Sequence, residues 1–116
     1  MLVVSLFTFV LPVTATAPIE PPLSSKEEMI EYATVQALQA KISPSTALTV
    51  IKCESSWNPK AIGDGGYSHG LVQIHSPSHP EISIEQAEDP KFAIDFLIYH
   101  LKAGNGNMWT CFRHIK

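Results

Sequence analysis

Residues 53–74 constrain the fold of this chain more than any other stretch. They read CESSWNPKAIGDGGYSHGLVQI. A helix that enters this stretch must end at Asn58-Pro59, because the residue before a proline is driven out of the α region. A short apolar run, residues 71–74, closes the stretch, and before it lies a cluster of glycines, Gly63, Gly65, Gly66 and Gly70. The predicted order is therefore a helix end, a tight turn or hairpin, and a short extended segment.

Two helical patterns precede the glycine cluster. Ser25 followed by Glu28 is a capping-box pattern, and it predicts a helix from there to about Lys41. Ser43-Pro44 predicts the start of a second helix, with serine as N-cap and proline at the first helical position. In the first helix, apolar residues recur at helical spacing and predict a core-facing stripe of Met29, Ile30, Ala33, Ala37 and Leu38.

Further short elements are predicted after the glycine cluster. The apolar run 71–74 fits a short buried strand or extended segment, and residues 75–83 fit an irregular crossing. Later capping patterns are Ser83 with Gln86, Asp89-Pro90 before an amphipathic helix ending at Gly104, and Asn107 before a final turn. The predicted fold is mainly α, of the α+β kind, with a small irregular or β-hairpin insert lining a cleft.

The N-terminus predicts export. With 116 residues, the chain is long enough for one small domain. Residues 1–17 are apolar and uncharged and end in Ala-Thr-Ala, which is typical of a secretory signal peptide; the alternative is an uncleaved membrane anchor. Residues 18–24 form a proline-rich linker, and residues 25–116 form the domain. We therefore expect a secreted, periplasmic or cell-wall-associated protein.

Two cysteines, Cys53 and Cys111, predict a structural disulfide in an exported domain of this size. Closing a loop of about 58 residues would stabilise the fold by about 4 kcal/mol through loop-closure entropy. The alternative is two free buried thiols. A redox function is disfavoured, because no C-x-x-C motif is present.

Charge and histidine content argue against several functions. The net charge is −3 and Lys and Arg form no cluster, so we expect no nucleic-acid partner. The histidines, His69, His75, His79, His100 and His114, form no H-E-x-x-H motif. Pro77 and Pro80 disfavour a helix that would bring His75 and His79 together. The histidine pattern therefore predicts no metal. We also expect no other cofactor and a monomer.

Glu54 is the candidate catalytic acid. It shares the apolar face of its helix with Val50 and Ile51, three or four residues away, and it lies in the last helical turn. Partial burial and the negative end of the helix dipole both disfavour a carboxylate there, so the group can stay protonated and donate a proton. The alternative is a glutamate that caps the core edge or pairs with Lys52 or Lys60.

Two blocks of the chain resemble the lytic transglycosylase (SLT-type) and goose-type lysozyme group of the lysozyme-like superfamily. The first is E-S-x-[FW]-N-P-x-A, present as residues 54–61, and the second is G-[LM]-[MV]-Q-I, present as residues 70–74. The glycine-rich turn separates them at the spacing of the family. The resemblance extends over roughly residues 30–104 and implies a lysozyme-like fold.

The resemblance implies cleavage of the β-1,4 bond between N-acetylmuramic acid and N-acetylglucosamine in peptidoglycan. Glu54 matches the single acid/base of a lytic transglycosylase, which leaves a 1,6-anhydro product and needs no second carboxylate. Residues matching or predicted to line the sugar site are Ser55, Trp57, Tyr67, Ser68, Gln73 and His75. For Trp57 the alternative is a core aromatic, and for His75 a solvated loop residue.

One family motif differs in this chain. The A-Y-N-x-G motif expected after the long helix is replaced by Ala103-Gly104-Asn105-Gly106-Asn107. Its tyrosine helps to position the catalytic glutamate; Tyr99 lies too early, and Trp109 is a rough substitute. The second hypothesis is therefore a catalytically weak or inactive saccharide-binding module. Asp64 is the only nearby loop carboxylate, and its alternative role is that of a turn residue.

Overall fold

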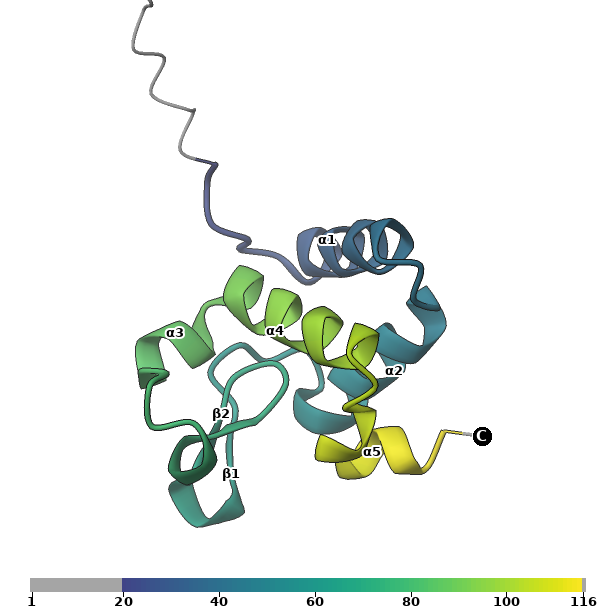
Figure 1. Ribbon diagram of the computed structural model, residues 1–116. Helices are drawn as coiled ribbons and strands as arrows, with labels where there is room; N and C mark the ends of the chain where they lie inside the picture. The colour runs from purple at the N-terminus through teal and green to yellow at the C-terminus, as the bar shows by residue number, and fades with distance from the viewer. Residues whose placement is uncertain (1–19, 116) are drawn as a thin grey trace, which may run out of the picture.

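Five α-helices and a small sheet make up residues 20–115, the part of the chain that this computed structural model describes (Figure 1). The predicted signal peptide and the first two linker residues lie outside the described part. The helices are α1 (Lys26–Gln39), α2 (Pro44–Ser55), α3 (Ile84–Glu88), α4 (Pro90–Lys102) and α5 (Thr110–Arg113). The strands are β1 (Ile62–Gly63), β2 (Ser68–His69) and β3 (Ile74–His75), and single 3-10 turns are η1 (Asp64–Gly66), η2 (Ser76–Ser78) and η3 (Gly106–Met108). The mainly α prediction with a small β insert is confirmed.

Local capping residues define the helix starts, largely as predicted. The Ser25 hydroxyl accepts a hydrogen bond from the Glu28 backbone N–H. Ser83 forms a complete capping box with Gln86. Asp89 accepts from the backbone N–H two residues later, and the following proline occupies the first turn of α4. At α2, Ser43 holds the N-cap position without a side-chain hydrogen bond, so the proline alone favours this start.

The glycine-rich stretch folds into an antiparallel sheet in the order β1-β2-β3. Ile62 pairs with His69, and Ser68 pairs with His75. The prediction of a short strand or extended segment over residues 71–74 is wrong, because residues 71–73 form a turn and only Ile74 belongs to a strand. The backbone N–H of Gln73 donates to the Gly70 carbonyl at 3.1 Å and Gln73 has a φ of 53°, so these residues form a tight turn.

Helix α4 lies between α1 on one side and the sheet with α5 on the other (Figure 1). Helix α2 packs against α1 and α5. Small side chains at the helix contacts let the backbones approach closely. The fully buried residues of the core are Ala33, Ala37, Ala47, Val50, Ile51, Leu71, Val72, Ala93, Ile94 and Leu97. The turn at 71–72 thus contributes core side chains between the helices, although it forms no strand.

Three details at the chain's periphery differ from the predictions. Helix α1 ends at Gln39, and Lys41 adopts a left-handed φ of 59°. Leu38, predicted to join the core stripe, is 61% exposed. Asn107 lies inside η3 and provides no cap, because α5 begins after Trp109, which holds the N-cap position without a side-chain bond.

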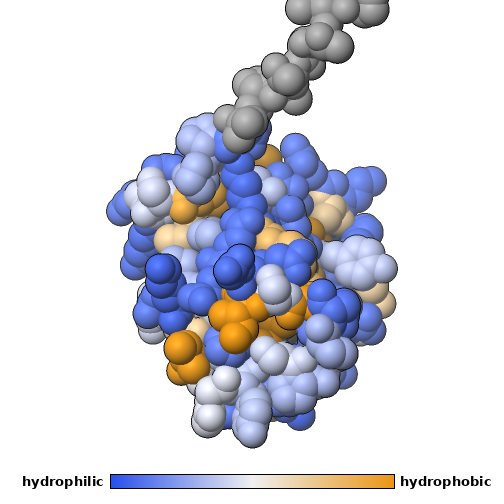
Figure 2. Space-filling view, turned by 90° about the vertical axis from the view of Figure 1, so that its left-hand side faces the viewer, coloured by the Kyte–Doolittle hydropathy of each residue, from blue (hydrophilic) through white to orange (hydrophobic). Residues whose placement is uncertain are grey.

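The described linker residues contact the domain. Glu20 forms an ion pair with Lys91 of α4 at 2.8 Å, and Leu23 packs against the core. Figure 2 shows the face on the side of α3 and the sheet, which is mostly hydrophilic around a hydrophobic area near its centre. Among residues 20–115, no helix combines the length and the hydropathy needed to cross a membrane.

Gly70 fixes the turn against helix α3. Its φ of 85° is left-handed, and an added Cβ atom would collide with the carbonyl oxygen of Ala87. Gly104 has a similar φ of 82°, but an added Cβ would meet no atom within 4 Å. A substitution at Gly104 therefore introduces left-handed backbone strain alone, whereas the same substitution at Gly70 introduces both strain and a steric clash.

We predict that Gly70→Ala destabilises the protein far more than Gly104→Ala. Left-handed strain alone should cost about 1–2 kcal/mol at Gly104, and the backbone clash at Gly70 should add about 1–3 kcal/mol. Urea unfolding followed by circular dichroism measures both values. Equal losses in the two variants would contradict the close packing of the turn on α3.

Candidate active site

Glu54 lies in the last turn of α2, where it is half-buried. Its carboxylate oxygen Oε1 accepts a hydrogen bond from the backbone N–H of Cys111, at a donor–acceptor distance of 3.5 Å. Helix α2 ends directly afterwards, because Ser56 and Trp57 adopt left-handed φ values of 51° and 65°. The carboxyl group is therefore held at a helix end, beside a segment 57 residues further along the chain.

Burial raises the pKa of the Glu54 carboxyl above its ordinary value. The Cys111 N–H acts in the opposite direction, because it stabilises the charged form and lowers the pKa. The negative charge of Asp64 is close enough to raise the pKa further. The expectation that burial disfavours the ionised form of Glu54 is thus confirmed.

The disulfide Cys53–Cys111 joins α2 to the C-terminal segment, with a Cα–Cα distance of 6.0 Å. The predicted pairing is confirmed. One half of the bridge precedes Glu54 in the sequence, and the other half carries the N–H that contacts Glu54. The covalent link and the hydrogen bond therefore hold the same two segments together.

Gln73 folds its amide back over the glycine-rich stretch. Its Nε2 donates to the carbonyl oxygens of Ala61 and Gly70, both at 3.0 Å. An added Cβ at Gly63 would collide with the Oε1 atom of Gln73. The absence of a side chain at Gly63 therefore leaves room for the Gln73 amide.

A pocket of about 230 Å³ adjoins this glutamine. It lies between the β3–η2 segment on one side and α4 with the Trp109 segment on the other. The lining residues are Gln73, Ile74, His75, Ser78, His79, Phe96, Met108 and Trp109. Glu54 does not line this pocket itself, but it contacts the segment that provides the pocket's Trp109 wall.

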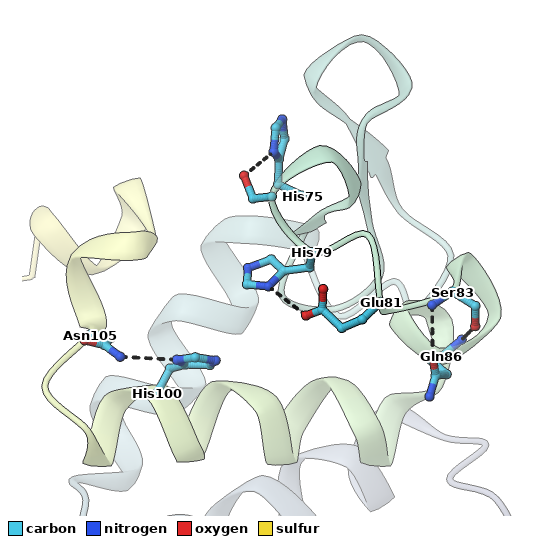
Figure 3. A network of polar contacts seen from close by, with 8 residues as sticks. His75, His79, Glu81, Ser83, Gln86, His100 and Asn105 are labelled. Atoms are coloured by element: carbon cyan, nitrogen blue, oxygen red, sulfur yellow. Dashed lines mark hydrogen bonds and ion pairs between the residues drawn. The ribbon is translucent and has the colours of Figure 1, made fainter.

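Histidine and aromatic side chains surround the pocket. Figure 3 shows His79 and His100 facing the same space between η2 and α4. Their ring centroids are 6.4 Å apart, and both rings pack against Phe96. Burial lowers the pKa of His100, and the neighbouring His79 lowers it further. His79 also approaches the Glu81 carboxylate at 3.5 Å.

The loop residues predicted to contact sugar differ in their exposure. Tyr67 is 58% exposed, and its ring centroid lies 6.3 Å from that of His75. His75 lines the pocket, and its Nδ1 lies 2.8 Å from the Ser78 hydroxyl oxygen. Ser68 is buried, and its hydroxyl donates to the Asp64 carboxylate. Tyr67 and His75 are thus accessible beside the pocket, whereas Ser68 orients Asp64.

Ser55 and Trp57 lie away from the pocket. The buried Ser55 hydroxyl donates to the Ile51 carbonyl oxygen at 3.1 Å. Trp57 is 7% exposed and borders a hollow between α1 and α2, together with Ile30 and Leu48. Direct sugar contact by these two side chains stays a prediction that their burial does not favour.

The family comparison agrees with this geometry. Residues 31–111, more than half of the chain, match the family described as "Transglycosylase SLT domain". The chain belongs to this family. No curated protein and no solved structure gave a significant match. As an SLT domain, the chain is a member of the lysozyme-like superfamily, as its two sequence blocks indicated.

Several pocket residues of this SLT domain were not singled out from the sequence as site residues. His79, Phe96 and Met108 line the pocket, and His100 packs on Phe96 beside it. Phe96 and His100 lie four residues apart on α4, a spacing that places both on one helix face. That spacing was a usable signal, but it did not indicate which side of the helix faces a cavity.

Metal binding finds no support in the described part of this SLT domain. Within residues 20–115, no group of three His, Cys, Asp or Glu side chains is arranged to hold a metal ion. The buried Nδ1 atom of His69 has no hydrogen-bond partner among these residues. His75 and His79, the pair four residues apart, use their Nδ1 atoms for Ser78 and Glu81.

We predict that Asp64→Asn lowers the pKa of Glu54, because it removes the negative charge that disfavours the Glu54 carboxylate. Asparagine can still accept the Ser68 hydrogen bond. Carbon-13 NMR titration of the glutamate carboxyl groups measures the change. Glu85→Gln, which removes an exposed carboxylate of α3, is the control and should leave the Glu54 titration in place. An unchanged or higher pKa in Asp64→Asn would contradict the assigned electrostatic role.

Proposed function

We propose that this SLT domain is a lytic transglycosylase that cleaves the β-1,4 bond between N-acetylmuramic acid and N-acetylglucosamine in peptidoglycan. The observation that carries the proposal is Glu54: a half-buried carboxyl with a raised pKa at the end of α2. It is the residue that occupies the acid/base position of the family motif. The pocket beside Gln73 supports the proposal, since it lies next to the segment that contacts Glu54.

In the first step, protonated Glu54 donates its proton to the glycosidic oxygen while the bond from that oxygen to the muramyl C1 breaks. The leaving sugar departs with a free 4-hydroxyl. The acetamido oxygen of the muramyl residue attacks C1 from the other face, so the substrate itself supplies the nucleophile. Burial suits this step, because it keeps a larger fraction of Glu54 protonated near neutral pH.

In the second step, Glu54 acts as a base. Its carboxylate removes the proton from the muramyl 6-hydroxyl, the oxygen O6 bonds to C1, and the bond from C1 to the acetamido oxygen breaks. The product is a 1,6-anhydromuramyl sugar, and Glu54 is protonated again. The hydrogen bond from Cys111 suits this step, because it stabilises the charged carboxylate that must form in between.

The surrounding residues receive supporting roles in the proposal. Gln73, Tyr67 and His75 contact the glycan strand at the pocket, where they are accessible. Ser68 acts indirectly by orienting Asp64, and Trp57 and Ser55 hold the end of α2.

The substrate fits a domain working outside the cytoplasm as a monomer on glycan strands. Export by the predicted signal peptide would bring it there. The activity needs neither a metal nor another cofactor, because Glu54 and the substrate supply every group in the two steps.

We predict that Glu54→Gln reduces turnover of purified peptidoglycan at least about 100-fold, because the amide can neither donate nor accept the transferred proton. Mass spectrometry of the released muropeptides measures turnover. It also identifies the reaction, because a 1,6-anhydro product is lighter by one water molecule than a hydrolysis product. Glu31→Gln, an exposed change on α1, is the matched control and should retain wild-type activity.

The muropeptide assay, combined with a binding assay, distinguishes the enzyme from the second hypothesis, a saccharide-binding module. A saccharide-binding module without turnover would retain peptidoglycan in a pull-down assay while releasing no muropeptide. Release that is unaffected by Glu54→Gln would instead show that another group acts as the acid.

A further inference from the structure

We infer that the C-terminal turn, residues 105–112, is the positioning device for Glu54, and that the Cys53–Cys111 disulfide must be closed for efficient turnover. This inference rests on the proposed function, because it assumes that Glu54 is the catalytic acid. In the family, the tyrosine of the A-Y-N-x-G motif helps to position the catalytic glutamate, and this chain lacks that tyrosine. The inference assigns the positioning role to the C-terminal turn instead. Tyr99 is 69% exposed, and its ring packs on His100, so its observed contacts lie away from Glu54.

The first observation concerns the partners of Glu54. Among the hydrogen bonds formed within residues 20–115, the carboxylate of Glu54 receives one, from the backbone N–H of Cys111. The disulfide fixes this donor, because Cys53 is the residue before Glu54 and its Cα lies 6.0 Å from that of Cys111. A backbone donor tied covalently to the neighbouring residue cannot move away from the carboxylate independently.

The second observation concerns the other end of the turn. The indole Nε1–H of Trp109 donates to the Val72 carbonyl oxygen at 2.7 Å, and the side chain is 4% exposed. The same indole packs edge-on against Phe96, with 6.1 Å between the ring centroids. Val72 precedes Gln73, so the turn is fastened both to the helix of Glu54 and to the backbone next to the pocket glutamine.

Third, the two ends of the turn pack against each other, but its helix is short. The ring of Phe112 lies so close to Gly106 that an added Cβ there would approach ring carbons to 2.5–2.7 Å. Helix α5 has four residues, and helices of this length are not stable without tertiary contacts. Its place therefore depends on the disulfide and on Trp109.

The chemistry explains why this fastening affects turnover. A catalytic carboxyl must point at the glycosidic oxygen, and a misplacement of about 1 Å can reduce the rate about 100-fold. The donor–acceptor distance of 3.5 Å is long for a hydrogen bond, as is common before substrate binds. Without the tether, Glu54 loses its donor and gains rotational freedom.

Opening the bridge is a two-electron reduction. A dithiol such as dithiothreitol attacks one sulfur as thiolate, and its second thiol then displaces the other cysteine, so that two protein thiols and one cyclic disulfide result. Neither cysteine belongs to the buried hydrophobic cluster, so we expect reduction to leave the core between α1, α2 and α4 folded. The inference therefore makes turnover depend on an oxidising compartment.

The test compares Cys53→Ser/Cys111→Ser with the wild type and with Arg113→Ala. Arg113 lies in the same short helix but outside residues 105–112, and its side chain donates to the Thr110 hydroxyl at the surface. This control therefore removes a surface contact of the helix and leaves the bridge, the Cys111 N–H and the Trp109 indole in place. We expect kcat on glycan strands to fall about 10- to 100-fold in the double variant, with KM changed less. Arg113→Ala should retain the wild-type kcat and KM.

A second readout distinguishes positioning from general loosening of the fold. Loss of the Cys111 donor alone raises the pKa of Glu54, because burial, the largest cause of the raised pKa, and the charge of Asp64 stay in place. The Glu54 signal in a carbon-13 NMR titration should therefore move to higher pH in the double variant. The alkaline limb of kcat/KM should move the same way. General loosening would instead expose the carboxyl to solvent and lower its pKa. A folded double variant with the wild-type kcat and the wild-type Glu54 titration would overturn the inference.

Two further arms cover a double variant that fails to fold. Trp109→Phe keeps the bridge and an aromatic ring at this position but removes the indole donor, and it should lower kcat several-fold while raising the Glu54 pKa. Wild-type protein opened with dithiothreitol should lose activity and regain it on reoxidation. Unchanged activity in both would overturn the inference. If the wild type shows no turnover at all, the proposed function fails, and the NMR titration still decides the positioning role.

Discussion

The contact between the end of α2 and the C-terminal turn is the interaction on which the rest of the site depends. It consists of one covalent bond, Cys53–Cys111, and one backbone hydrogen bond to Glu54. A domain of this size buries a limited core, and its helices meet through small residues such as Ala33 and Ala47. The disulfide therefore replaces packing that a larger domain could provide, and it does so beside the carboxyl group that the proposed reaction uses.

Local signals in the sequence predicted the helices well, because their physical cause is local. Ser25, Ser83 and Asp89 each accept a backbone N–H within three residues, so the sequence pattern and the structure contain the same interaction. The prediction of a strand or extended segment at residues 71–73 failed for the opposite reason. Its shape depends on Gly70 meeting the backbone of Ala87, a contact between distant parts of the chain that no local pattern contains.

The candidate site was predictable in its chemistry but only partly in its geometry. Helical spacing placed Glu54 on the apolar face, and its burial follows. Trp57 shows the limit: two left-handed residues at the end of α2 direct its side chain into a hollow between α1 and α2, away from the pocket. For Trp109, the sequence could not reveal the contact with Val72, because Val72 lies 37 residues earlier and becomes its neighbour only through the fold.

Glu54 is subject to opposing influences that suit the two steps proposed for it. A good acid requires that its charged form be disfavoured, and burial with the charge of Asp64 does this. A good base requires that the same charged form be reached during the reaction, and the Cys111 N–H stabilises it. Burial alone would leave an acid that is reluctant to ionise, while stronger hydrogen bonding would leave a carboxylate that is reluctant to take up a proton. A single donor held by a covalent tether lies between these extremes, and this balance explains how one carboxyl group could serve both steps without a second.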